Sequence, residues 1–380
     1  MKAAFAVFCG STLFGVLPLD DSIRARNTSF AFSSANTCVL SLRGVAEGGS
    51  FPSPGDSDYA AGMSDQKIVK WAAIHGRWRF EGAEAKYEGP QPPQVGQLVN
   101  RPFGICLSDV RFSEGEARTI VRLPAQIGPS AIASHIDPET SAYLMFGFRA
   151  LTEEYTLAGL AGFQSAYTIS RFGPNLAWNA VAVAGSKENL IPEREYEIAV
   201  RVRGQRLILI VDGIRVLEHV LEVPIEYAQL GLVGWGEGEV VFRNTSVTQE
   251  PGKVFVVMQF SPPYDELYKD VIQPLSEKSG LQAYHAGEVF GPGVILDDIV
   301  RGIEEAKIVI AEITAPNENV FYELGYAHAL KKPTILLADR TKKLPFDISG
   351  YRCLFYENSI GGKRKVEEAL DKHLKAILHE

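Results

Sequence analysis

The sequence predicts two folds in one chain, an antiparallel β-sandwich of jelly-roll type followed by an α/β region built on a parallel sheet. The length of 380 residues exceeds what a single hydrophobic core usually organises. Residues 71–249 contain short runs of alternating apolar and polar residues separated by turn residues, which is typical of antiparallel strands. Residues 250–380 instead alternate strand patterns with helical patterns. We therefore expect a structural boundary near residue 250.

The composition is that of a soluble globular protein, with 46% hydrophobic and 22% charged residues. The net charge of −8 is not concentrated in a block of like charges, which argues against nucleic acid as a partner. The four cysteines lie far apart without a CxxC pair, so the pattern predicts neither a zinc site nor a disulfide framework. This cysteine usage favours a reducing compartment, and we expect a cytoplasmic protein that binds no membrane.

Residues 1–70 are expected to be disordered or poorly structured. The first twenty residues contain one lysine and an apolar run of the length that a secretory signal uses, so a signal segment is the alternative. No small-x-small cleavage site follows this run, and it is shorter than the ~20 residues that span a bilayer. Residues 25–66 are rich in Ser, Asn, Gly and Pro without periodicity, as in linkers.

The clearest antiparallel pattern is residues 196–220, YEIAVRVRGQRLILIVDGIRVLEHV. Its three alternating runs are separated by a turn at Gly204 and by Asp212-Gly213, the dipeptide of type I′ hairpins. Similar runs recur at the spacing typical of sandwiches and barrels. They are EARTIVRLP, AYLMFGFRA, YTLAGLAGF, AYTISRF, QLGLVGWG and EVVFRNTSV. Trp178 and Trp235 are either core residues of this sandwich or side chains that stack on a sugar.

The α/β region opens after Pro251-Gly252 with a nearly continuous apolar strand, VFVVMQF, as expected for a strand buried on both faces. Helical patterns then begin near residues 264, 293, 319 and 365, with strand patterns between them. This alternation predicts βαβ crossovers and a five-stranded parallel sheet wound in the flavodoxin-like manner. We expect Pro274 to kink the first helix and Gly280 to end it.

Glu323 is the candidate catalytic residue. It lies about one turn into the helix NVFYELGYAHAL, which follows the third strand, and ligands of parallel sheets bind where the strands end. Its helical line continues with Ala327 and Leu330, so the carboxylate is not on an obviously solvated face, and the helix dipole is expected to keep it ionised. Such a carboxylate suits the cationic state that forms when an N-glycosidic bond breaks. The competing interpretation is that it only pairs with the dipole.

The candidate substrate-binding residues lie in or near the loops that follow the strands. They are Gln259, Phe260, Gly291, Gly293, Asp297, Asn317, Asn319, Tyr322 and Phe346. Each asparagine is either a helix N-cap or a ligand for sugar hydroxyls, and the two glycines form either a turn or a phosphate contact. The three aromatic residues are either core or pocket wall, and the aspartate, in mid-helix, faces either the crevice or solvent. No second His or Cys lies at metal spacing from His328, so we assign no metal.

Residues 253–357 resemble the TIR-like and nucleoside 2-deoxyribosyltransferase-like superfamily. The resemblance rests on four segments in the family's order, VFVVMQFS, GVILDDIVRGIEEAKIVIAEIT, NVFYELGYAHALKKPTILL and LPFDISGYRCLFY. It implies that Glu323 is the catalytic glutamate, which acts on the anomeric carbon of a nucleoside or of NAD. The deoxyribosyltransferases are expected to carry an aspartate six residues earlier. This chain has Asn317 there, which argues against base exchange.

Residues 75–248 resemble the concanavalin A-like lectin/glucanase sandwiches. The segments that carry this resemblance are GICLSDVRFSEGEARTIVRL, YTISR and YEIAVRVRGQRLILIVDGIRV. The paired-carboxylate strand E-x-D-x-x-E of the family's glycoside hydrolases does not occur. The resemblance therefore implies a binding or scaffolding role rather than a glycosidase.

These interpretations together predict a TIR-like effector that cleaves NAD as its substrate, needs no cofactor, and carries a lectin-like sandwich as sensor or scaffold. The alternatives are a nucleoside 2-deoxyribosyltransferase or nucleosidase, a non-enzymatic nucleotide-binding signalling module, and a structural adaptor. The expected partners are NAD or a nucleoside, and a glycan or protein ligand for the sandwich. By resemblance alone, a homo-oligomer is also implied.

Overall fold

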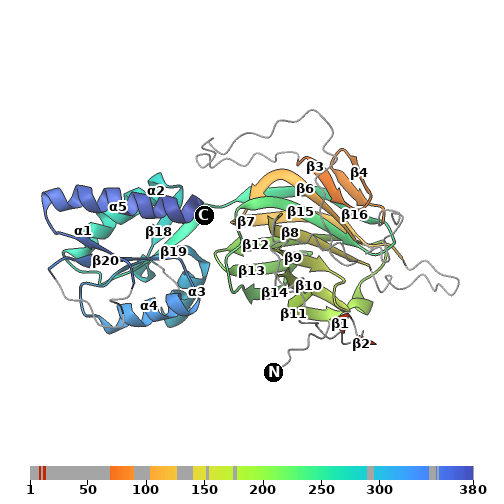
Figure 1. The fold of residues 1–380 in the computed structure, drawn as a ribbon. Coiled ribbons are helices and arrows are strands. Elements are labelled where there is room, and N and C mark those ends of the chain that lie inside the picture. Colours follow the sequence, from red (N-terminus) through yellow and green to blue (C-terminus); the bar gives the residue numbers. More distant parts are fainter. Residues whose placement is uncertain are drawn as a thin grey trace, which may run out of the picture. The chain divides into compact units, whose positions relative to one another are not determined.

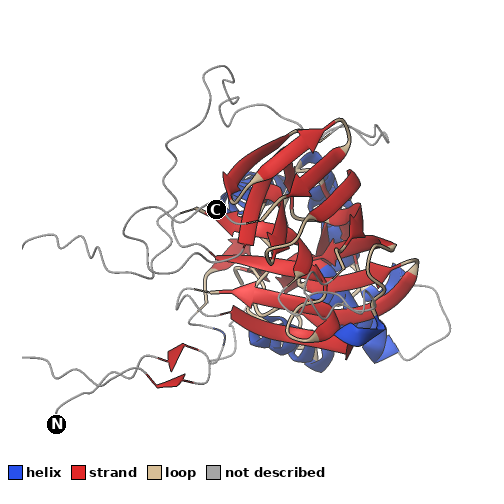
Figure 2. Ribbon diagram, turned by 90° about the vertical axis from the view of Figure 1, so that its right-hand side faces the viewer, coloured by secondary structure: helices blue, strands red, loops and turns tan. Residues whose placement is uncertain are grey.

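The structure is a computed structural model, and it describes most of the chain from residue 69 onward (Figures 1 and 2). The described residues are 8–9, 12–13, 69–89, 103–125, 140–150, 154–173, 178–288, 295–341, 348 and 351–379. Those from residue 69 onward belong to one compact unit. Strands β1 (Phe8–Cys9) and β2 (Thr12–Leu13) pair antiparallel in a separate unit. The expectation for residues 1–70 falls almost wholly outside the described residues.

Two antiparallel sheets of seven strands each form the sandwich, which confirms the predicted fold of this region (Figure 1). The first sheet, in spatial order, contains β11 (Trp178–Ser186), β10 (Ser165–Phe172), β9 (Glu154–Leu160), β8 (Ser141–Arg149), β15 (Ala228–Trp235), β6 (Phe103–Phe112) and β3 (Trp71–His75). The second contains β14 (Ile214–Val220), β13 (Arg206–Val211), β12 (Glu195–Arg203), β7 (Gly115–Arg122), β16 (Val240–Gln249), β5 (Glu84–Tyr87) and β4 (Trp78–Glu81). A 3-10 turn, Lys187–Asn189, follows β11.

The alternating runs of the sequence become the two inner faces of this sandwich. On β12, Ile198, Val200 and Val202 point into the core cluster, in which Phe242 of β16, in the same sheet, is completely buried. The β13–β14 turn is the predicted type I′ turn, because Asp212 (φ 50°) and Gly213 (φ 78°) both have positive φ. The sequence pattern therefore identifies the meander β12–β13–β14 with its turns.

A five-stranded parallel sheet forms the α/β region, as predicted. Its strands are β18 (Leu281–Tyr284), β17 (Gly252–Val257), β19 (Ala306–Glu312), β20 (Thr334–Asp339) and β21 (Cys353–Tyr356), in that spatial order. The first strand in the chain thus lies second in the sheet, which is the flavodoxin-like arrangement. The order reverses at β17, and this is the switch point near which such sheets bind ligands.

Helices cover both faces of this sheet. The helical elements are α1 (Tyr264–Leu267), a π-helical turn (Tyr268–Ile272), α2 (Gln273–Lys278), a 3-10 turn (Ala286–Glu288), α3 (Ile295–Glu305), α4 (Glu318–Ala329) and α5 (Ile360–His379). Val254 and Val256 of β17 pack in one cluster with α5, and Phe255 and Val257 pack in another with α3 and α4. Alternate residues of one strand therefore face opposite layers, which explains the continuous apolar run.

The first helical segment differs from its prediction. The π-helical turn interrupts it before Pro274, and Pro274 occupies the first turn of the following helix, where its missing N–H is tolerated. Gly280 ends α2 with φ 72°, as predicted. Among the described helices, none combines the length and apolar character that a bilayer crossing requires.

Candidate functional site

The carboxyl edge of the parallel sheet is where β17, β18, β19 and β20 end, at Val257, Tyr284, Glu312 and Asp339. Helix α4 starts here, since it follows β19 after a short loop. Asn317 is its N-cap, and the Asn317 Oδ1 accepts a hydrogen bond from the Asn319 backbone N–H at 3.0 Å. Asn319 is exposed in the first turn. Of the two interpretations offered for the asparagines, capping thus holds for Asn317.

Glu323 lies in the second turn of α4, next to the buried residues Leu324 and Ala327 that attach the helix to the sheet. Its side chain is half-buried. Within the described part of the chain, no hydrogen bond or ion pair reaches its carboxylate. Burial raises the pKa of Glu323 to about 7. The carboxyl is therefore about half ionised at pH 7, less than expected from the helix dipole, because burial disfavours the charged form.

The raised pKa of Glu323 has a consequence for stability. The folded protein holds this proton more tightly than the unfolded chain, whose value is near 4.5, so stability is lost as pH rises from about 4.5 to about 7. We expect Glu323→Gln to be more stable than the wild type at pH 8 by about 1 kcal/mol. Each pKa unit of the shift corresponds to at most about 1.36 kcal/mol, and the summed effect of the whole shift is discounted to this figure because the side chain is partly solvated. Urea unfolding at pH 5 and pH 8 tests this, and an equal difference at both values would contradict it.

Two aromatic candidates of the site are exposed rather than part of the core. Tyr322 is 59% exposed on α4 and Phe260 is 42% exposed after β17. The Phe260 ring stacks on His285, with 3.7 Å between the ring centroids. Gln259, the neighbouring candidate, donates from Nε2 to the Ser261 Oγ at 2.9 Å. Phe260 and His285 thus form a stacked pair where β17 and β18 end.

His285 is a residue of this edge that the sequence did not single out. Burial is the main cause that lowers the pKa of His285, and nearby Glu288 opposes it, so the imidazole is mainly neutral at pH 7. Its position directly after the second predicted strand was the available signal. The stacked pair therefore offers an uncharged aromatic surface, of the kind on which a heterocyclic base stacks.

Glu312 is a second acid that the sequence did not single out. It is the last residue of β19 and only 1% exposed, and its Oε1 accepts hydrogen bonds from the Thr314 N–H at 3.2 Å and the Tyr356 hydroxyl at 3.0 Å. The Thr314 hydroxyl bonds to Glu312 as well and accepts from the Asp339 N–H at 2.7 Å. Burial raises the pKa of Glu312. This network holds the residues that lead from β19 into α4.

Glu312 and Glu323 serve different faces of the sheet. Glu312 alternates with Ile308 and Ile310, which belong to the cluster covered by α5, whereas α4 packs in the cluster on the other face. The structure therefore gives no paired-carboxylate arrangement between these two acids. The sequence predicts KIVIAEIT as a buried strand, and within such a run Glu312 does not stand out as a site residue.

Of the remaining candidates, the structure describes Asp297. Asp297 is exposed in the first turn of α3 instead of in mid-helix. Gly291, Gly293 and Phe346 lie outside the described residues. The ring of His328 stacks on Tyr351, with 4.4 Å between centroids. Among the residues that the structure describes, no group of three His, Cys, Asp or Glu is placed to hold a metal ion.

Trp178 and Trp235 lie outside the inter-sheet core of the sandwich, whereas Trp71 and Trp78 pack against it. Trp235 alternates along β15 with Leu232 and Leu230, which face the core cluster, so it belongs to the opposite side of the first sheet. Trp178 meets Trp235 edge to face, with 5.5 Å between ring centroids, and Trp235 also stacks on Phe103 at 5.3 Å. Both tryptophans are half-buried. Aromatic side chains therefore line up across this outer face.

No protein-family model and no curated protein matches the sequence. A carbohydrate-binding module from Bacillus subtilis is 15% identical, with 48% of this chain and 96% of that chain covered and a TM-score of 0.36. A CMP N-glycosidase from Clostridium botulinum is 19% identical over 32% of this chain and 98% of that chain, with a TM-score of 0.26. The TIR domain of a Toll-related receptor from Hydra magnipapillata is 16% identical over 32% of this chain and 97% of that chain, with a TM-score of 0.27.

Proposed function

We propose that the α/β region breaks the N-glycosidic bond between nicotinamide and ribose in NAD, with Glu323 as the catalytic carboxylate. The observation that carries this proposal is the state of Glu323, half-buried and without a partner in the described structure. An acid that is desolvated without a compensating cation is unfavourable in the free protein, and such groups are found where a ligand supplies the missing partner. The resemblance of the surrounding motif to glutamates that act on anomeric carbons supports the same role.

The chemistry requires one carboxylate. As the bond from the ribosyl carbon to the nicotinamide nitrogen breaks, its electron pair goes to the pyridinium, which leaves as neutral nicotinamide. Positive charge develops on the ribosyl carbon, and the Glu323 carboxylate stabilises it. Water then attacks that carbon and loses a proton, so that NAD and water give nicotinamide, ADP-ribose and one proton.

A substrate whose base is already cationic while attached to ribose suits this site better than a nucleoside with a neutral base. The base of an ordinary nucleoside leaves as an anion unless an acid protonates it, and an aspartate six residues before the glutamate is expected to help with this in the deoxyribosyltransferases. Here the position is Asn317, whose side chain is engaged as the N-cap of α4. Nicotinamide needs no such acid, and this favours NAD over nucleosides as the substrate.

The aromatic pair beside the switch point supports nucleotide binding. We assign to Phe260 and His285 the stacking of a heterocyclic ring, and to Tyr322 and Gln259 contacts with the remainder of the nucleotide. The proposal is tested by incubating the purified chain with NAD and, separately, with deoxyadenosine. Release of nicotinamide alone supports it. Release of adenine would favour the nucleosidase alternative, and binding of NAD without turnover would favour a non-enzymatic signalling module.

The activity should depend on pH through the Glu323 carboxyl. The carboxylate is the active form, and its pKa is about 7 in the free protein. We expect kcat/KM for NAD to rise about tenfold per pH unit below pH 7 and to level off above it, since kcat/KM reports groups of the free enzyme. Initial rates between pH 5 and pH 9 measure this, and a profile without an acid limb would contradict the role of Glu323.

For the sandwich we propose a saccharide ligand, bound on the outer face that carries Trp178 and Trp235. The ring contacts that join these two side chains support this proposal, because the apolar faces of sugars stack on such surfaces. Binding of the chain to a panel of immobilised glycans tests it. Loss of the bound glycan in Trp178→Ala and in Trp235→Ala, with unchanged thermal unfolding, is the expected result.

A further inference from the structure

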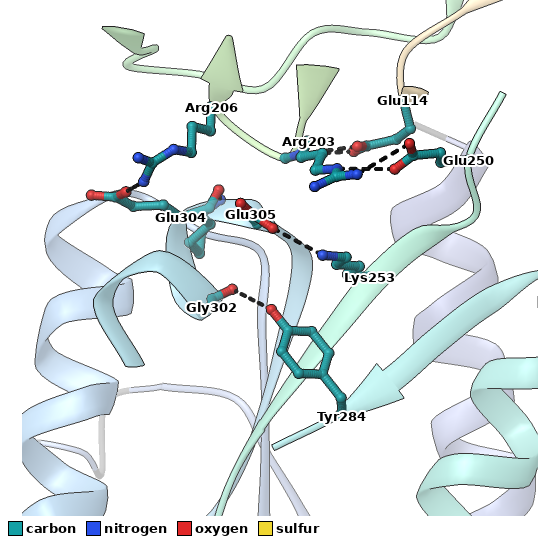
Figure 3. Close-up of polar contacts among 11 residues, drawn as sticks. Glu114, Arg203, Arg206, Glu250, Lys253, Tyr284, Gly302, Glu304 and Glu305 are labelled. Atoms are coloured by element: carbon teal, nitrogen blue, oxygen red, sulfur yellow. Dashed lines mark hydrogen bonds and ion pairs between the residues drawn. The ribbon is translucent and has the colours of Figure 1, made fainter. Parts of the chain in front are cut away.

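The turn between β12 and β13, residues 203–206, contacts the C-terminal end of α3 (Figure 3) and, through Gln205, also that of α4. Gln205 is completely buried at this turn. Its backbone N–H donates to the Glu304 carbonyl at 3.0 Å, and its Nε2 donates to the Leu330 carbonyl at 3.0 Å. These carbonyls lie at the C-terminal ends of α3 and α4, where a helix has no intrahelical donors left. One residue of the sandwich therefore supplies hydrogen-bond donors to both helices.

The turn is packed so closely that its shape is restricted. Gly204 has φ 56°, and a Cβ placed on it would lie 2.6 Å from the Glu304 carbonyl oxygen and 2.7 Å from that of Ala306. The Gly204 N–H donates to both carboxylate oxygens of Glu114, at 2.9 and 3.2 Å. The conformation and the space both require glycine here. The turn therefore packs against the end of α3 without room for a side chain at residue 204.

A chain of polar contacts leads from this turn to the helix of Glu323. The Arg206 guanidinium donates to the Glu304 Oε2 at 2.8 Å (Figure 3). The other oxygen of the Glu304 carboxylate, which is only 9% exposed, accepts from the Tyr326 hydroxyl at 3.0 Å. Tyr326 lies three residues after Glu323, one helical turn along α4. Arg206 and Tyr326 therefore share one buried carboxylate.

Helix α4 is held at several points, one of them directly by the sandwich, through Gln205, and one indirectly, through Arg206 and Glu304. At its start Asn317 caps it, and along its length Val320, Leu324 and Ala327 are buried against the sheet. At its end Gln205 bonds its carbonyl and Glu304 holds Tyr326. A carboxylate that must meet one carbon atom of a substrate is sensitive to shifts of about 1 Å, which can reduce turnover by about 100-fold. The position of Glu323 thus depends on contacts made by another fold.

We propose that Gln205 and Arg206 are positioning residues for Glu323, so that the sandwich completes the catalytic geometry of the α/β region. This inference rests on the proposed NAD cleavage. It assigns to the sandwich a part in the reaction in addition to the ligand binding proposed above.

The test compares Arg206→Gln with Arg201→Gln in the full chain. Arg201 is the matched control, because it pairs with Glu116 inside the sandwich, at 2.8 Å, and among the described residues it forms no hydrogen bond or ion pair with α3 or α4. We expect Arg206→Gln to lower kcat for NAD about tenfold with KM changed less than twofold, and Arg201→Gln to leave both unchanged. Arg206→Lys should recover part of the loss.

Tyr326→Phe gives a second test through the shared carboxylate. If Arg206 acts through Glu304 and Tyr326, the double variant Arg206→Gln/Tyr326→Phe should lose no more than about as much kcat as either single variant. Losses that multiply would overturn the inference, and so would an Arg206→Gln variant with wild-type kcat.

Hydrogen exchange separates this inference from the proposed function. Amides of residues 318–330 should exchange several-fold faster in Arg206→Gln than in Arg201→Gln, whether or not NAD is cleaved. If the wild type cleaves no NAD but this difference is present, the proposed function is wrong and the positioning of α4 by the sandwich stands. If exchange in α4 is the same in both variants, the inference is wrong.

Discussion

Replacing Glu323 by glutamine is expected to lower kcat for NAD cleavage by on the order of 10³-fold. The change keeps the size of the side chain and removes only the negative charge, so it deletes the stabilisation of the ribosyl cation. The measurement is nicotinamide release at pH 8, where the wild-type carboxyl is mostly ionised. KM should change little, because the charge acts mainly in the transition state.

Helix α4 itself supplies the control for this experiment. Glu318 is an exposed acid in the first turn of the same helix, and Glu318→Gln should retain wild-type kcat. Because Glu323→Gln is also expected to be more stable than the wild type at pH 8, unfolding would not account for its inactivity. A variant that is folded, stable and fully active would remove Glu323 from the mechanism.

The largest expected effect on stability comes from Gly302→Ala. Gly302 lies in α3 against β17, and a Cβ there would be 2.5 Å from Cε2 of Phe255, a ring that is completely buried. The alanine must push the helix off the sheet or force the ring aside, and overpacking of this kind destabilises by about 1–3 kcal/mol. We expect a loss of about 3 kcal/mol in the free energy of unfolding, measured by urea denaturation.

Gly325→Ala is the same change in a helix that has room for it. Apart from its chain neighbours and the backbone of its own helix, no atom of the described residues lies within 4 Å of the position of its Cβ, and alanine favours helices over glycine by about 1 kcal/mol. This variant should therefore be more stable than the wild type by up to about 1 kcal/mol. If the two variants had equal stability, the packing of α3 on Phe255 would not be the cause of the predicted loss.

The fold was predictable where the sequence pattern is strictly local. The meander β12–β13–β14 combines strict alternation with an Asp-Gly turn, and the strands of the parallel sheet are continuous apolar runs between helical patterns. Strand β11 was not predicted, because WNAVAVAGS alternates small residues that do not distinguish one face from the other. Strands β3, β4 and β5 were likewise not named individually, since each is only four or five residues long.

The chemistry of the site was predictable only in part. The position of Glu323 on its helix follows from periodicity, but its raised pKa depends on how deeply the surrounding segments cover it, which no local pattern expresses. Glu312 and His285 were missed for the same reason, because Tyr356 and Phe260, which contact them, are distant in the sequence. Phe260 and Tyr322 were expected in the core or in a pocket wall, and the core is where aromatic residues lie on average. At the edge of this sheet both side chains are instead exposed.

The close fit of the β12–β13 turn has a consequence for recombination of this gene. Only two residues, Glu250 and Pro251, connect the last sandwich strand to the first strand of the parallel sheet. A chimera that joined the α/β half to a foreign sensor at this junction would inherit two helix ends with bare carbonyls and a buried glutamate lacking its arginine. Replacement of the sandwich is therefore expected to leave the α/β region stable only when the new domain carries a turn equivalent to residues 203–206.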